Sequence, residues 1–194
     1  MLLNTLKQFN WLDIFILIMI FRICYIALKA GFPIEVFKFL GSLTAIYVSM
    51  HYYTMLSDFI KSRIPIEENM PLEFIDFLVF LLLAISGYLL FVLLRSVFSH
   101  FIKIEAVSAL NKWGGLILGL FRSILLVSLI FFTLAISSVS YLKDSVKRSY
   151  LGPRLFSIAP DTYAWAWNNL ASKFINSEKQ NNVVLEVKKE ILPK

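Results

Sequence analysis

Four long blocks of apolar residues dominate the chain, and shorter polar stretches separate them. The blocks cover residues 11–28, 34–56, 72–98 and 113–139. A helix needs about 20 apolar residues to cross the hydrocarbon layer of a bilayer, because each residue adds about 1.5 Å to its length. Each block is therefore predicted to be a transmembrane helix. Four spans place both termini on the same side of the membrane.

Polar residues and helix breakers predict how the blocks are connected. Gly31 and Pro33 interrupt the helical pattern between the first two blocks and predict a short turn there. Residues 57–71 form the most polar connection of the first half. Residues 99–112 join the third block to the fourth and are long enough to hold a short turn of interfacial helix.

After Val139 the chain becomes amphipathic. Asp161 follows Pro160 and is predicted to cap a helix over residues 161–176, because its carboxylate can accept unpaired backbone N–H groups. Large apolar residues recur at helical spacing along this segment: Tyr163, Trp167, Leu170 and Phe174. Such a helix can lie in the plane of the lipid headgroups or pack on the end of the bundle. Residues 177–194 are predicted to be a polar, frayed tail.

Composition supports an integral membrane protein. Hydrophobic residues make up 58% of the chain and charged residues 16%, whereas a soluble domain carries about 25% charged residues. The net charge of +6 is attributed to Lys and Arg beside the spans, not to nucleic-acid binding, because no basic patch with interleaved aromatic residues lies outside them. The fold class predicted is all-α, with one membrane domain over residues 1–176.

Two carboxylates stand near the start of odd-numbered spans and therefore at the same face of the membrane. These are Asp13 and Asp76. A carboxylate in the first turn complements the helix dipole and can reach water, which is the favoured interpretation. The other interpretation is a role in handling protons or ions.

Four further charges are predicted to lie in the opposite half of the bilayer, near the two short connections. They are Arg22, Glu35, Arg95 and Arg122. A lone charge at that depth costs several kcal/mol unless it is paired or hydrated. The cluster could pair internally, bind a lipid phosphate or hold an acidic group of a partner. Snorkelling to the interface is the competing interpretation and is favoured for Arg95.

Small residues on the helices indicate close packing, whereas residues suited to catalysis are missing. Gly115 and Gly119 share one face of the fourth span, and Gly41 with Ala45 forms a weaker small-residue face. No histidine or cysteine has partners at metal-ligand spacing, and no phosphate-binding loop or nucleophile motif is present. We therefore expect no enzyme activity, no metal and no cofactor.

Three segments of the chain resemble the colicin V production (CvpA) family of bacterial membrane proteins. They are the start Asn10-Trp11-Leu12-Asp13, the turn Gly31-Phe32-Pro33-Ile34-Glu35, and Asn111-Lys112-x-x-Gly115-x-x-x-Gly119-x-x-Arg122. The last resembles the family pattern Asp-Arg-x-x-Gly-x-x-x-Gly-x-x-Arg-Gly. Asn111, Lys112 and Ser123 depart from it, and the missing aspartate weakens any acid–base or salt-bridge role at position 111.

The resemblance implies a four-span protein of the bacterial cytoplasmic (inner) membrane, linked by name to colicin V production or export. Lys and Arg are nearly balanced between the two faces. Some relatives continue into a periplasmic serine protease domain, which favours periplasmic termini. The function expected is a non-enzymatic scaffold or accessory factor that forms homo-oligomers or binds other membrane proteins. The alternative is a small oligomeric transporter or channel with a polar path lined by Asp and Arg; an intramembrane enzyme is the weakest hypothesis.

Overall fold

The computed structural model describes residues 9–63, 71–101, 108–175 and 178–192. The described chain is helical and contains no strand. Four of its helices are long and apolar enough to cross a membrane: α2 (Trp11–Ala30), α3 (Phe32–Arg63), α4 (Leu72–Phe101) and α5 (Ser108–Ala135). The protein is therefore a multi-pass, all-α membrane protein, as the apolar blocks predicted.

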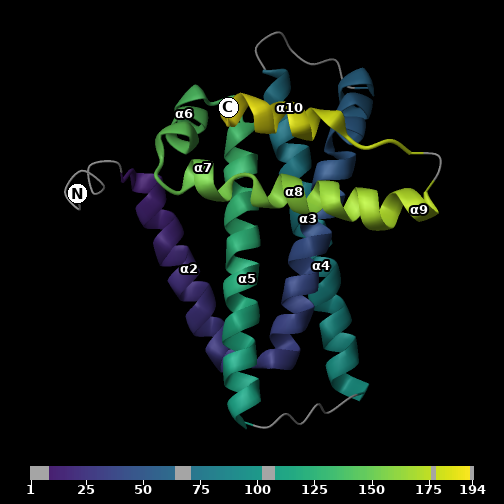
Figure 1. The fold of residues 1–194 in the computed structure, drawn as a ribbon. Coiled ribbons are helices and arrows are strands. Elements are labelled where there is room, and N and C mark those ends of the chain that lie inside the picture. Colours follow the sequence, from purple (N-terminus) through teal and green to yellow (C-terminus); the bar gives the residue numbers. More distant parts are fainter. Residues whose placement is uncertain (1–8, 64–70, 102–107, 176–177, 193–194) are drawn as a thin grey trace.

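The four spans pack in the order α2, α5, α3, α4 (Figure 1). α5 lies between α2 and α3, and α4 packs almost entirely on α3. Small residues allow the close approaches: a Cβ on Gly87 would lie 2.9 Å from the Ala45 Cα, and one on Gly41 would lie 3.2 Å from the Tyr88 carbonyl oxygen. Because α2 and α4 stand at the two ends of the row, each exposes a long apolar face.

The turn between α2 and α3 is tighter than the predicted connection over residues 29–33. Gly31 alone separates the two helices, and its φ of 83° lies in the region that favours glycine. Pro33 lies in the first turn of α3, where a missing N–H removes no helical hydrogen bond. The Phe32 N–H donates to the Asn111 side-chain oxygen of α5 at 2.8 Å, which caps α3 from another helix.

Two of the helices have other bounds than the predicted spans. α3 continues to Arg63, beyond the predicted span end near residue 56, and Lys61 in this extension forms an ion pair with Asp76 of α4. α5 runs over Ser108–Ala135 instead of 113–139. The possible interfacial turn in residues 99–112 falls partly outside the described residues, since α4 continues to Phe101 and 102–107 are not described.

Beyond α5 the chain forms a C-terminal arm, which we define as residues 140–175. It contains α6 (Ser140–Arg148), α7 (Gly152–Leu155), α8 (Ile158–Ala166), a π-helical turn η1 (Trp167–Ala171) and α9 (Ser172–Phe174). Figure 1 shows the arm crossing the row of spans sideways, near the end where α2 begins and α5 ends. We call that end the terminal face and the opposite end the short-connection face.

Two predictions about the C-terminal region were wrong. The helix expected over residues 161–176 begins at Ile158, so Asp161 is not its cap; the Asp161 carboxylate binds Lys188 instead. The tail expected to be frayed contains α10 (Asn182–Ile191), which buries Val184 and Ile191. The division of the chain into 1–176 and 177–194 stays a prediction.

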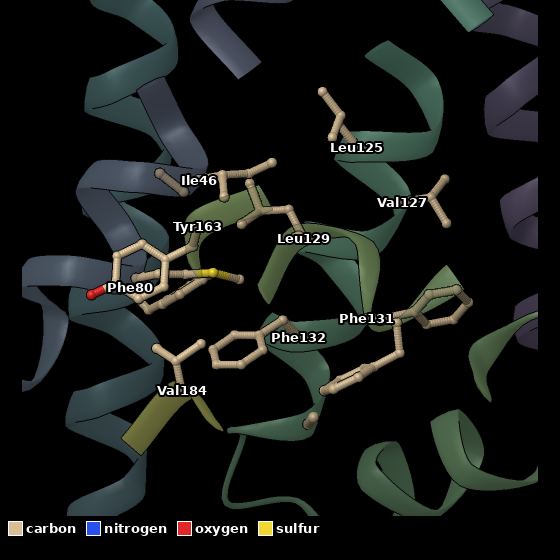
Figure 2. Packing of buried hydrophobic residues seen from close by; sticks show 14 of the residues in the cluster. Ile46, Phe80, Leu125, Val127, Leu129, Phe131, Phe132, Tyr163 and Val184 are labelled. Carbon is tan, nitrogen blue, oxygen red and sulfur yellow. The ribbon is translucent and has the colours of Figure 1, made fainter. Parts of the chain in front are cut away.

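The main apolar core lies where the arm meets the spans. Figure 2 shows side chains from five helices converging there: Ile46 of α3, Phe80 of α4, Phe132 of α5, Tyr163 of α8 and Val184 of α10. The Phe80 and Phe132 rings lie 5.3 Å apart, and Phe132 stacks on Phe156 of the arm at 5.9 Å. The arm is therefore an integral part of the fold.

Candidate functional site

A fully buried carboxylate joins three of the spans. Glu35, in the first turn of α3, has no exposed surface, and Arg122 of α5 is 6% exposed. Arg122 Nη2 lies 3.0 Å from Glu35 Oε2, while Lys38 Nζ donates to Glu35 Oε1 at 2.7 Å. Arg122 Nη1 also donates to the Tyr88 hydroxyl of α4 at 3.0 Å. We call Glu35 and Arg122 the buried ion pair; both charges are compensated within the chain.

Glycines on α5 make room for this ion pair. Gly119 lies three residues before Arg122, and helix side chains lean toward the N-terminus of their helix, so the guanidinium extends toward Glu35. A Cβ on Gly119 would overlap the Ala27 Cβ of α2, and one on Gly115 would lie 2.8 Å from the Ala27 carbonyl oxygen. The small-residue face of α5 therefore packs against α2 of the same chain.

The structure joins only part of the predicted charge cluster. Arg22 is exposed on α2, and Arg95 is half-buried near the end of α4. Neither forms an ion pair or hydrogen bond with another described residue. Internal pairing therefore applies to Glu35 and Arg122, with Lys38 as a second cation, and does not extend to Arg22 or Arg95.

The two carboxylates at the terminal face also have partners. Asp13 is fully buried and forms a capping box with Asn10. Its oxygens also accept the backbone N–H groups of Tyr150 at 3.0 Å and Leu151 at 2.8 Å, which attaches the arm to the start of α2. Asp76 accepts a hydrogen bond from Lys61 at 2.7 Å. Asp13 lies in the first turn of α2 as predicted but does not reach water, and Asp76 lies beyond the first turn of α4.

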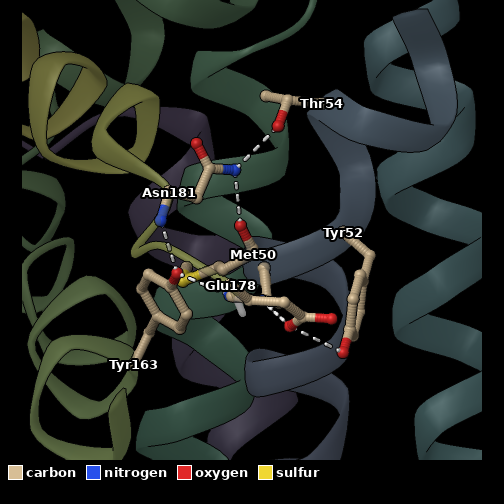
Figure 3. Close-up of polar contacts among 7 residues, drawn as sticks. Met50, Tyr52, Thr54, Tyr163, Glu178 and Asn181 are labelled. Atoms are coloured by element: carbon tan, nitrogen blue, oxygen red, sulfur yellow. Dashed lines mark hydrogen bonds and ion pairs between the residues drawn. The ribbon is translucent and has the colours of Figure 1, made fainter. Parts of the chain in front are cut away.

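A second polar network connects α3 to the C-terminal region (Figure 3). His51 Nε2 lies 2.7 Å from Glu178 Oε2, and His51 Nδ1 lies 3.0 Å from the Tyr163 hydroxyl. Asn181 donates its backbone N–H to the same hydroxyl at 2.8 Å and its side-chain NH₂ to the Met50 carbonyl at 2.8 Å. We call His51, Tyr163, Glu178 and Asn181 the C-terminal anchor.

The Tyr163 hydroxyl joins the C-terminal region to α3. Burial raises the pKa of this hydroxyl. Its oxygen accepts the backbone N–H of Asn181 and also lies within hydrogen-bond distance of His51 Nδ1. The other ring nitrogen, Nε2, contacts the Glu178 carboxylate, so both nitrogens of His51 have a hydrogen-bond partner.

Sequence reasoning missed the anchor. It treated His51 as a residue without metal-ligating neighbours and placed Glu178 in a frayed tail. The partners of His51 lie 112 and 127 residues further along the chain, a separation that no local pattern reveals. The one available signal was Asn181 followed by apolar residues at helical spacing, which is typical of a capped amphipathic helix.

The arm packs on the spans, which is one of the two arrangements predicted for the amphipathic helix; a position in the headgroup plane stays a prediction. Tyr163 and Trp167 are buried, and Trp167 stacks on His51 with ring centres 4.9 Å apart. Leu170 and Phe174 are exposed, Phe174 by 85%. Together with α3, the arm encloses an apolar groove of about 440 Å³, with Leu43 of α3 among its lining residues. The arm thus packs on the spans and also presents an apolar face outward.

The polar contacts of these sites are ion pairs and hydrogen bonds. No group of three or more potential metal ligands occurs among the described residues. In the anchor, the hydrogen-bond neighbours of His51 are a phenol and a carboxylate, and neither is a serine or cysteine nucleophile.

Comparison with known proteins identifies the family. The family model described as colicin V production protein matches residues 12–160, which include all four spans and the first part of the arm. No curated protein and no solved structure matches the chain. The resemblance noted in the sequence is confirmed by the family model, which covers more than half of the chain. The chain therefore belongs to the colicin V production protein family.

Proposed function

We propose that this protein is a non-enzymatic membrane scaffold or accessory factor for envelope processes, including toxin production or secretion. One observation carries the proposal: the three carboxylates that the sequence singled out in or near the spans each hold parts of the fold together. Asp13 binds the arm, Glu35 binds Arg122 and Lys38, and Asp76 binds Lys61. Groups engaged in this way serve to keep the helices in place.

The shape of the row supports a role in binding other membrane proteins or further copies of the chain. α2 and α4 stand at its ends, and no other helix of the described residues covers the outer side of either one. Exposed apolar side chains follow α2 (Ile14, Ile18, Phe21) and α4 (Leu82, Ile85, Leu89, Leu93). Such faces can take up lipid or another transmembrane helix without burying a charge.

The alternative is a small oligomeric transporter or channel with a polar path. In that case the buried ion pair would have to open, since Glu35 has no exposed surface and Arg122 is 6% exposed. A path would also need several copies, because the four spans form an open row. This alternative predicts a measurable flux, and the scaffold does not.

Two measurements separate the hypotheses. The first places a photo-crosslinking residue at Leu89 on α4 in cells that produce colicin V, with buried Phe131 as the matched control position. The scaffold predicts a discrete protein adduct at an outward position and none at Phe131. The second measures ion flux in proteoliposomes. A flux that Glu35→Gln abolishes, together with adducts to lipid alone, would favour the transporter.

We also propose the bacterial inner membrane as the location, with both termini in the periplasm. The orientation rests on relatives that carry a periplasmic protease after the spans. The test is a reporter fused after Lys194: alkaline phosphatase activity is expected, and fluorescence from cytoplasmic GFP would reverse the orientation.

A further inference from the structure

The net charge, meaning cationic minus acidic side chains, differs between the two faces of the molecule. The half of the spans at the short-connection face carries one described carboxylate, Glu35, and six cationic side chains: Arg22, Lys29, Lys38, Arg95, Lys112 and Arg122. The terminal face carries nine described carboxylates against ten cationic side chains: Lys61, Arg63, Lys143, Lys147, Arg148, Arg154, Lys173, Lys179, Lys188 and Lys189. The excess of positive charge therefore lies at the short-connection face.

This excess is not neutralised within the described chain. Glu35 already binds Arg122 and Lys38. Arg22 and Lys29 of α2 form no ion pair with a described residue. Arg22 lies eight residues before the end of α2, about 12 Å along the helix, and is exposed. A guanidinium at that depth needs an anionic partner or water.

Three residues on α2 form a continuous outward stripe at this face. Arg22, Tyr25 and Lys29 are spaced three and four residues apart, so they share one side of the helix. The side that packs on α5 is the opposite one, where Ile16 and Ala27 are fully buried. Tyr25 is 58% exposed, and Lys29 Nζ lies 4.4 Å from its ring centre. The stripe therefore combines two cations and a phenol on a surface that faces lipid.

We infer that the Arg22–Tyr25–Lys29 stripe binds the phosphate of an anionic phospholipid in this leaflet. A guanidinium and an ammonium provide the donors that a phosphate accepts, and the aromatic ring is typical of the headgroup level. The exposed side chains Ile18 and Phe21, further into the bilayer, would lie along the acyl chains of the same lipid. The net positive charge of this half adds long-range attraction for anionic over zwitterionic headgroups.

The test compares lipids retained by the purified full-length protein. Native mass spectrometry counts phosphatidylglycerol and phosphatidylcholine molecules bound from mixed micelles, and thermal unfolding is followed with each lipid added. The wild type is expected to prefer phosphatidylglycerol. Arg22→Gln with Lys29→Gln should lower that preference roughly tenfold to thirtyfold, because each cation near the headgroup level contributes to the attraction.

Two control proteins make the result specific. Lys173→Gln with Lys179→Gln removes the same charge from exposed sites of the terminal face and should leave the preference unchanged. Arg22→Lys with Lys29→Arg keeps both charges and should retain the lipid. This control shows that substitution at the two positions does not by itself release the lipid.

Three outcomes would overturn the inference. The first is equal phosphatidylglycerol retention by Arg22→Gln/Lys29→Gln and the wild type. The second is an equal loss in the terminal-face control. The third is a rise in unfolding temperature with inorganic phosphate that matches the rise with phosphatidylglycerol, because this would assign the stripe to a free anion. If the stripe variant kept its lipid but lost a crosslink to another protein, the stripe would belong to a protein interface.

Discussion

The buried ion pair and the C-terminal anchor each bring a carboxylate to a basic side chain, yet they differ in depth and in origin. Glu35 and Arg122 lie between transmembrane helices, where neither has appreciable contact with solvent. In the anchor, His51 is buried but Glu178 is exposed and lies outside any span. Removing one partner should therefore leave a buried charge that has lost a counter-charge in the first case and a hydrated carboxylate in the second.

The two sites also differ in what surrounds them. The buried ion pair depends on close helix packing at Gly115 and Gly119. The anchor depends on a series of single hydrogen bonds through Asn181, which also caps α10 with its side-chain oxygen. We expect damage at the ion pair to affect the whole fold, and damage at the anchor to release the C-terminal region alone.

The largest effect is expected from Arg122→Met, which leaves Glu35 buried with Lys38 as its remaining cation. Breaking a buried pair by removing one partner costs about 3–5 kcal/mol. Unfolding in detergent micelles, followed by circular dichroism, measures this cost. The double variant Glu35→Gln/Arg122→Met should recover part of the loss, since no fully buried charge remains and the ammonium of Lys38 is partly exposed. A double variant less stable than the single one would show that the pair is not the main cause.

The next effect concerns the packing that supports the ion pair. Gly119→Ala places a methyl group onto the Ala27 Cβ and is expected to cost about 1–3 kcal/mol. Gly114→Ala is the matched control on the same helix, because the nearest atoms belong to the exposed ring of Phe32, which can move. Equal stability of the two variants would mean that α2 and α5 are not closely packed at Gly119.

A smaller and more local effect is expected at the anchor. His51→Phe keeps a ring against Trp167 but removes the hydrogen bonds to Tyr163 and Glu178, a loss of about 1–2 kcal/mol. Hydrogen exchange should accelerate in residues 178–191, while the spans stay protected. Lys179→Gln, next to Glu178, serves as the control. Faster exchange throughout α5 would contradict the separation between the two sites.

The smallest effect is expected at the cap of α3. Asn111→Asp places a negative charge at a helix N-terminus, which should stabilise the fold by about 0.3–1 kcal/mol. Asn111→Ala removes the acceptor for the Phe32 N–H and should destabilise it by about 1 kcal/mol. The difference between the unfolding midpoints of these two variants measures how much the cap at position 111 stabilises the fold. Similar midpoints would show that the cap contributes little to stability.

Much of the membrane domain was predictable because apolar helices carry a local signal. Residue spacing was enough to predict the four spans and the close packing at the glycines of α5. It also predicted that Glu35 and Arg122 lie at a similar depth. The ends of the helices were less predictable, because contacts between helices occur there. Lys61 near the end of α3, for example, forms an ion pair with Asp76 of the next helix. Arg22 and Arg95 were expected to cluster with Glu35 because of their similar depth. Depth does not determine toward which side of its helix a residue points, and neither arginine points toward Glu35.

The sequence by itself determined that this is a four-span helical membrane protein of a recognisable family, because hydropathy and glycine spacing are local properties of a helix. The tertiary structure alone decided what the polar residues do. It made Asn111 a cap for α3, attached the arm to Asp13, and turned an apparent tail into α10 joined to His51. These contacts link residues far apart in the chain, and their hydrogen bonds depend on a geometry that only packed helices provide.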